Sequence, residues 1–190
     1  MKVLFSNPPW WAGTSTLKLE NGQDCEVWTG GLRAGSRWPF TTTMRSQPDK
    51  FAWGDYRPYP FFMGYAATYA AQKTGADVTF RDSIALSESY DAYFRYLQEE
   101  RFDMIFIESA TPSWRHDRAI IAAIAEVLPD AEMVVTGPIA ANEDTAFKAK
   151  SVKAIIKGEY EKGAVKVIAG ADGVIGHDLL TREEMNEAPF

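Results

Sequence analysis

A short apolar run that opens into a polar turn constrains the fold of this chain more than any other stretch. The run Met104 to Ile107 is followed directly by Glu108 to Trp114, which reads ESATPSW. An apolar run without polar alternation is typical of a parallel strand covered by helices on both faces. A helix is expected to follow at once, with Thr111 as its cap and Pro112 in its first turn. Its apolar stripe comprises Ile120, Ile121, Ile124, Val127 and Leu128.

The same alternation of strand and helix recurs along the chain. The other expected strands cover residues 2–6, 77–81, 132–136 and 153–157, and the other expected helices cover 59–74, 87–100 (capped by Ser87), 143–149 and 160–168. Because crossovers between parallel strands are right-handed, this alternation predicts helices on both faces of one sheet. We therefore expect an α/β, Rossmann-like (flavodoxin-like) doubly wound sheet of five parallel strands in the order 2-1-3-4-5.

A long insertion, residues 13–58, separates the first strand from the first helix and shows no helical period. Asn21-Gly22 is a strong signal for a tight turn between antiparallel strands and predicts a hairpin near residues 15–29. The rest mixes Gly, Arg, Trp and Pro, and an irregular segment of this length usually has a function. Arg33, Arg37, Arg45 and Arg57 are candidates for binding amide or phosphate groups, with ordinary surface charge as the alternative for each.

Composition limits the classes of partner. A chain of 190 residues that is 46% hydrophobic can bury the core of one domain. The net charge of -6 argues against nucleic acid and anionic membranes as partners, since both require clustered Lys and Arg. The strand-like start KVLF has none of the features of a leader peptide, so a cytoplasmic protein is expected. Cys25 is the only cysteine, which excludes a three-cysteine iron–sulfur motif within this sequence.

A ligand of a doubly wound sheet binds beyond the carboxyl ends of the strands, where the strand order reverses. The segments 7–10 and 108–114 are expected to face this crevice. A dinucleotide would require a glycine-rich turn after the first strand, but NPPWWAG holds a single glycine. A phosphoacceptor receiver domain would require a cluster of acidic side chains at the strand ends to hold a metal ion. The first strand ends in Ser6-Asn7 instead, which argues against this class of domain. Residues 13–16 could form a flavodoxin-like phosphate-binding loop, but no helix follows whose N-terminus could bind the phosphate.

Six motifs occur in order along nearly the whole chain. They are NPP at 7–9, YPFFMGYAATYAA at 59–71, GADVTFRDS at 75–83, IFIESATPSW at 105–114, VVTGP at 134–138 and IIKGEYE at 155–161. Together they resemble the N-terminal cobalamin-binding domain of B12-dependent radical SAM enzymes. The resemblance implies a cobalamin-binding domain over 1–170. Residues 171–190 would be a tail or linker towards a radical SAM domain in cis, which would hold S-adenosylmethionine and a four-iron cluster.

The resemblance also implies which residues contact cobalamin. One side of the corrin would be contacted by Asn7, Pro8, Pro9 and Trp10, and Ser109, Ala110 and Thr111 would lie beneath it. The nucleotide tail would lie beside Gly137, Pro138, Ile139, Gly158, Glu159 and Tyr160. The remaining residues expected to contact the cofactor are Asp82, Ser83 and Glu108. The small residues would permit close approach of the backbone to the tail. Either glycine could equally serve only to end its strand tightly.

One departure from related B12 domains bears on the cobalt ion. Many of those domains carry Asp-x-His-x-x-Gly after the first strand, and its histidine replaces the cofactor's own base. Here Pro8, Pro9 and Trp10 occupy that place, so base-off cobalamin without a protein histidine ligand is expected. His116 is expected at the surface of a helix and His177 in the solvated tail. Trp10, Trp11, Trp38 and Trp114 could cover the corrin, with core packing as the alternative.

The expected role is that of a domain without catalytic residues of its own. It would present cobalamin to a radical SAM barrel for methyl transfer or related radical chemistry. The alternative is a non-catalytic flavodoxin-like module that binds a nucleotide or a protein partner.

Overall fold

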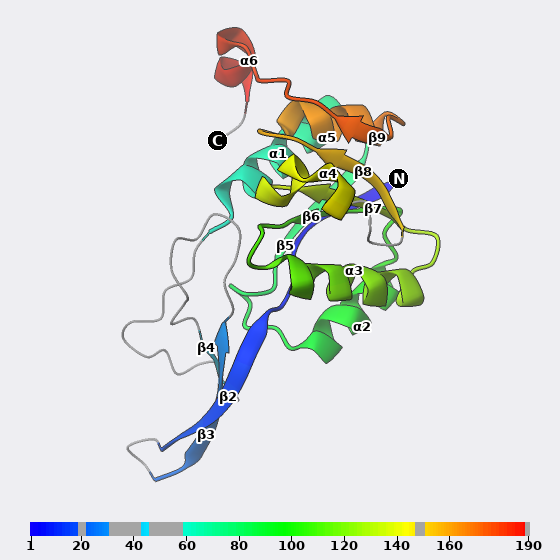
Figure 1. The fold of residues 1–190 in the computed structure, drawn as a ribbon. Helices are drawn as coiled ribbons and strands as arrows, with labels where there is room; N and C mark the ends of the chain where they lie inside the picture. Colours follow the sequence, from blue (N-terminus) through cyan, green and yellow to red (C-terminus); the bar gives the residue numbers. More distant parts are fainter. Residues whose placement is uncertain (19–21, 31–42, 46–58, 147–150, 189–190) are drawn as a thin grey trace.

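The computed structural model describes residues 1–18, 22–30, 43–45, 59–146 and 151–188. Its centre is a sheet of six parallel strands in the order β5-β1-β6-β7-β8-β9 (Figure 1). The strands are β1 (Lys2–Asn7), β5 (Asp77–Asp82), β6 (Met104–Glu108), β7 (Glu132–Thr136), β8 (Val152–Ile156) and β9 (Gly173–Ile175). Numbered along the chain, this order is 2-1-3-4-5-6, so the α/β class and the order of the first five strands are confirmed.

The predicted number of five strands is wrong, because β9 extends the sheet at its β8 edge. Ala154 pairs with Gly173 and Ile156 pairs with Ile175 in parallel register. This strand lies within the range 171–190 that was expected to be a tail or linker. It is only three residues long and begins at a glycine, so no hydrophobic period marks it. Its pairing partner is distant in sequence, and only the tertiary structure brings the two together.

Helices cover both faces of the sheet (Figure 1). They are α1 (Phe61–Lys73), α2 (Tyr90–Glu100), α3 (Trp114–Val127), α4 (Glu143–Ala146), α5 (Glu161–Ile168), α6 (Arg182–Glu187) and the short 3₁₀ helix η1 (Pro138–Ala141). Buried side chains of α2, α3 and α4 form one core cluster with one face of the strands. Buried side chains of α1 and α5 form a second cluster with the opposite face.

Neighbouring residues of β1 and β6 contribute to different core clusters, as expected because successive side chains of a strand point to opposite faces. Leu4 and Ile105 pack beneath α2 and α3. Phe5 and Phe106 lie on the other face, beneath α1 and α5, with their ring centroids 4.4 Å apart. Both faces of each strand are therefore buried, which explains why the run from Met104 to Ile107 shows no polar alternation.

Helices α2 and α3 begin later than the sequence predicted. Ser89 caps α2, since its side chain accepts a hydrogen bond from the Ala92 N–H, whereas Ser87 has a positive φ of 52° and lies in the preceding turn. Helix α3 begins at Trp114, so Thr111 and Pro112 also belong to a turn and not to the helix. In that turn the Ser113 hydroxyl bonds to the backbone of Ala110, which delays the start of the helix.

The hairpin predicted near residues 15–29 is confirmed. β2 (Trp11–Lys18) and β3 (Asp24–Gly30) are antiparallel, and β4 (Thr43–Arg45) pairs with β3. The hairpin projects from the body of the domain (Figure 1). Residues 19–21, 31–42 and 46–58 are outside the described part of the chain. Arg33, Arg37, Trp38 and Arg57 fall in these gaps, and the side chain of Arg45 is likewise not described.

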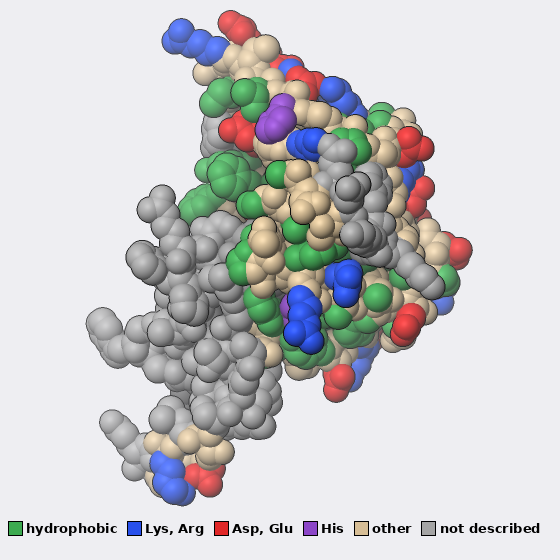
Figure 2. Space-filling model, viewed as in Figure 1, with side chains coloured by type: hydrophobic (Ala, Val, Ile, Leu, Met, Phe, Trp, Pro, Cys, Tyr) green, Lys and Arg blue, Asp and Glu red, His purple; other side chains and the backbone are tan. Residues whose placement is uncertain are grey.

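The exterior carries charged side chains of both signs, interspersed over the face shown in Figure 2. Hydrophobic side chains gather beside the start of α1, where Tyr59, Phe61, Phe62 and Tyr65 are exposed. Within the described residues, every helix is too short or too polar to cross a lipid bilayer.

Candidate functional site

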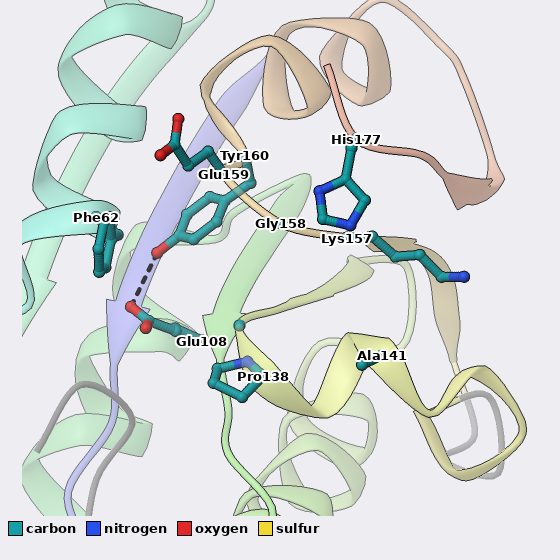
Figure 3. A pocket seen from close by; sticks show the side chains of 10 residues that line it. Phe62, Glu108, Pro138, Ala141, Lys157, Gly158, Glu159, Tyr160 and His177 are labelled. Carbon is teal, nitrogen blue, oxygen red and sulfur yellow. Dashed lines mark hydrogen bonds between the residues drawn. The ribbon is translucent and has the colours of Figure 1, made fainter. Parts of the chain in front are cut away.

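A cavity of about 600 Å³ lies at the carboxyl ends of β6, β7 and β8 (Figure 3). It is lined by Phe62, Glu108, Gly137, Pro138, Ala141, Lys157, Gly158, Glu159, Tyr160 and His177. This volume lies within the range typical of small-ligand sites. The position also agrees with the rule that doubly wound sheets bind ligands beyond the carboxyl ends of their strands.

Glu108 and Tyr160 point towards one another at the cavity (Figure 3). The Tyr160 hydroxyl donates a hydrogen bond to Glu108 Oε2 at 2.9 Å, and both residues are buried. Burial, reinforced by the neighbouring Glu108 charge, raises the pKa of Tyr160 well above its ordinary value. The phenol therefore keeps its proton at neutral pH, and it holds one oxygen of the Glu108 carboxyl group in place.

Gly137 allows the end of β7 to approach the turn after β6. Its φ of +85° is in the region that favours glycine, and an added Cβ would lie 2.7 Å from the Ser109 carbonyl oxygen and 2.8 Å from Glu108 Cγ. The Ile139 N–H donates to the same Ser109 carbonyl at 3.1 Å. This close approach places η1, with Pro138 and Ala141, at the rim of the cavity.

Gly158 ends β8 and contacts a residue from the far end of the chain. Its φ is +73°, and a Cβ at this position would clash with the His177 imidazole. His177 therefore lies directly against the Gly158 backbone and forms part of the cavity wall (Figure 3). His177 is exposed, as predicted for a tail residue, but its place in the cavity wall was not predicted.

Ion pairs hold the segment after His177 on the domain. Lys162 of α5 pairs with Asp178 at 3.3 Å and with Glu184 of α6 at 2.8 Å. Thr181 and Glu184 form a capping box that starts α6. Hydrogen bonds from Lys166 and Lys162 lower the pKa of Asp178. Since α6 has no buried residue, the position of this segment depends mainly on polar contacts.

Polar side chains at the ends of β1 and β5 are engaged with one another. The Asn7 side-chain amide donates to Asp82 Oδ1 at 2.8 Å, and the same oxygen accepts from the backbone N–H groups of Ile84 and Ala85. The Ser83 hydroxyl donates to Glu88 at 2.7 Å. These bonds fix the turn after β5, which lies at the same edge of the sheet as the cavity but does not line it.

His116 is half-buried, contrary to the expectation of a surface position. Its ring stacks on Trp10 with centroids 4.9 Å apart. Nε2 lies 3.0 Å from the Tyr90 hydroxyl, and Nδ1 lies 3.3 Å from Oδ1 of the buried Asp117. An ionised carboxylate only accepts hydrogen bonds, so Nδ1 carries a proton towards Asp117. Both ring nitrogens therefore have partners within the protein.

The described tryptophans differ in environment. Trp114, the first residue of α3, packs in the core against the sheet, as the core-packing alternative predicted. Trp10 and Trp11 are half-buried at the end of β1, and the Trp11 indole N–H donates to the Glu88 carbonyl oxygen at 2.8 Å.

All residues that the sequence predicted to contact a ligand lie at the carboxyl edge of the sheet. Those lining the cavity are Glu108, Gly137, Pro138, Gly158, Glu159 and Tyr160. Those buried elsewhere along this edge are Asn7, Pro8, Pro9, Asp82, Ser83, Ser109, Ala110 and Ile139, whereas Trp10 is half-buried and Thr111 is exposed. The buried side chains pack against the protein interior and stabilise the carboxyl edge of the sheet.

Among the described residues of the cavity wall, sequence reasoning missed four: Phe62, Ala141, Lys157 and His177. Lys157 could have been found, because it directly precedes Gly158. Phe62 gave no signal, because it falls at the helical spacing typical of core-facing residues, yet its side chain is exposed. His177 gave no signal, because its position depends on the unpredicted strand β9.

Among the side chains that the structure describes, no group of three or more His, Cys, Asp and Glu is placed to hold a metal ion. Comparisons with protein-family models, with curated proteins and with solved structures found no match to this chain, so its function is inferred from the sequence and from this cavity.

Proposed function

We propose that this chain binds cobalamin at the carboxyl edge of its sheet, as the B12 domain of a radical SAM enzyme that performs methyl transfer or related radical chemistry. One observation supports this proposal most strongly. Residues implied by the resemblance to B12 domains, from three separate motifs, line a single cavity at the ends of adjacent strands. These motifs are ESAT at the end of β6, TGP at the end of β7 and KGEY after β8.

The cavity fits one part of the cofactor. It is too small for a whole cobalamin, but Phe62, Pro138 and Ala141 offer apolar surface suited to a flat benzimidazole. The nucleotide tail would therefore enter the cavity, and the corrin would lie over the turns after β1 and β6. With its tail held in the cavity, cobalamin would be bound base-off, because the benzimidazole could not also coordinate the cobalt ion.

Among the described residues, the turn after β1 offers no histidine as a ligand for cobalt. Pro8 and Pro9 carry no side-chain donor atom, and both nitrogens of His116 are engaged with Tyr90 and Asp117. When bound, cobalamin would supply a cobalt ion that can accept and give a methyl group. The chain itself would bind and orient the cofactor and keep imidazole away from its lower face.

Retention of cobalamin tests the proposal. The protein incubated with hydroxocobalamin is expected to keep about one equivalent through desalting, because a cofactor whose nucleotide tail is held in such a cavity leaves slowly. The absorbance of the eluted protein measures this directly. Complete loss of the cofactor, with retention of an adenine or flavin nucleotide, would instead support the flavodoxin-like nucleotide-binding module.

The cobalt ligand can be examined separately by electron paramagnetic resonance. Bound Co(II) is expected to show no nitrogen splitting, and His116→Ala is expected to leave its spectrum unchanged, because the His116 ring nitrogens are engaged within the protein. An axial nitrogen would split each cobalt line into three. Splitting that disappears in His116→Ala would identify His116 as a ligand, and splitting that survives would identify the cofactor's own base.

A further inference from the structure

We propose that Glu108, held in place by Tyr160, recognises a ribose hydroxyl of the ligand in the cavity. This inference rests on the proposed function, under which the ribose belongs to the nucleotide tail of cobalamin. It assigns a specificity-determining role to one carboxyl group and a positioning role to one phenol.

Glu108 is the buried one of the two acidic residues known to line the cavity, the other being the exposed Glu159. Glu108 is the last residue of β6 and is 9% exposed, with its carboxyl group at the cavity. An ionised carboxylate offers about four acceptor positions, and the Tyr160 hydroxyl occupies one of them. A carboxylate at a cavity wall accepts hydrogen bonds, so it favours a ligand that brings a donor group.

Tyr160 and Gly137 restrict how Glu108 can move. Tyr160 is buried in the core cluster beneath α1 and α5, so its hydroxyl is a fixed donor. The Glu108 stem passes so close to Gly137 that even a methyl group there would contact it. Glu108 is therefore oriented before a ligand arrives, which is the condition for a precise hydrogen bond.

The chemistry of the nucleotide tail indicates which group Glu108 would contact. The phosphate is anionic and would be repelled by a carboxylate. The benzimidazole has no N–H group, because one nitrogen carries the ribose and the other has only a lone pair. The ribose hydroxyls are donors, and dinucleotide-binding folds also use a carboxylate to recognise a ribose hydroxyl. A ribose hydroxyl is thus the best partner for Glu108 in this tail.

Dissociation constants for hydroxocobalamin and for cobinamide, which lacks the nucleotide, provide the test. Glu108→Gln is expected to weaken cobalamin binding about 10- to 100-fold, the loss typical of a hydrogen bond to a charged group. Cobinamide binding should be unchanged, because cobinamide has no ribose. Glu132→Gln, which removes the same charge at the amino end of β7, serves as the matched control and should affect neither ligand.

A cobalamin whose ribose hydroxyls are methylated separates the ribose from the rest of the tail. Wild-type protein should bind it more weakly than hydroxocobalamin, and Glu108→Gln should add no further loss, since the two changes remove the same contact. Tyr160→Phe should give a smaller loss restricted to cobalamin. Melting temperatures show whether each variant is folded, and Tyr160→Phe replaces Glu108→Gln in the test if the latter unfolds.

The two proposals fail in different ways. Wild-type protein that binds no cobalamin overturns the proposed function and the ribose contact with it. The ribose contact alone is overturned if wild-type protein binds cobalamin but the variants lose affinity for cobinamide and cobalamin equally. It is also overturned if the variants lose affinity for neither ligand. An additive loss with the methylated cobalamin would also overturn it.

Discussion

Gly137→Ala is expected to lower the free energy of unfolding by about 3 kcal/mol or more, which for a chain of this size lowers the melting temperature by roughly 6–12 °C. Gly137 has φ +85° and ψ -171°, a combination that is essentially restricted to glycine and costs other residues about 1–3 kcal/mol. In addition, the new methyl group would lie 2.7 Å from the Ser109 carbonyl oxygen, which as backbone cannot move aside freely. Overpacking of this kind costs about 1–3 kcal/mol more.

Two other glycines separate these contributions. Gly170 has φ +107° but nothing within 4 Å of an added Cβ, so Gly170→Ala should show backbone strain alone. Gly75 has neither a positive φ nor a close neighbour, so Gly75→Ala should be close to neutral. Thermal unfolding of the three variants gives the comparison. A Gly137→Ala variant that is no less stable than Gly170→Ala would contradict the close approach between the turns after β6 and β7.

Ala141→Trp is expected to weaken cobalamin binding by more than about 100-fold, because the indole would occupy the space proposed for the benzimidazole. Ala141 is an exposed residue of η1 that lines the cavity, so the substitution should change the unfolding free energy little. Cobinamide, which does not enter the cavity, should be affected much less. Equilibrium titration with both ligands measures the two effects.

Ala122→Trp is the matched control for this experiment. Ala122 is also exposed, but it lies on α3 and does not line the cavity. The control should therefore leave the affinity for cobalamin unchanged. If Ala141→Trp binds cobalamin as tightly as Ala122→Trp, the nucleotide tail does not occupy this cavity, and the placement of the cofactor proposed above is incorrect.

The sequence alone determined the class of fold and the edge at which the site lies. Apolar runs such as Met104 to Ile107 must be buried on both faces, and helical repeats between them require crossovers, so a parallel sheet with helices on both sides follows. Asn21-Gly22 similarly predicted the hairpin through local turn chemistry. Glycine and polar residues directly after apolar runs placed Glu108, Gly137 and Gly158 at one edge, because the carboxyl ends of parallel strands lie together.

Only the tertiary structure decided the features that depend on contacts between distant segments. Strand β9 is too short to be recognised by period and exists through its pairing with β8. His177 reaches the cavity because β9 carries the chain back to Gly158. His116 is half-buried because Trp10 and Tyr90, from two other parts of the fold, lie against its ring. Local propensity and period describe a residue's own segment, whereas burial and hydrogen bonding at these positions depend on which segments the fold packs against it.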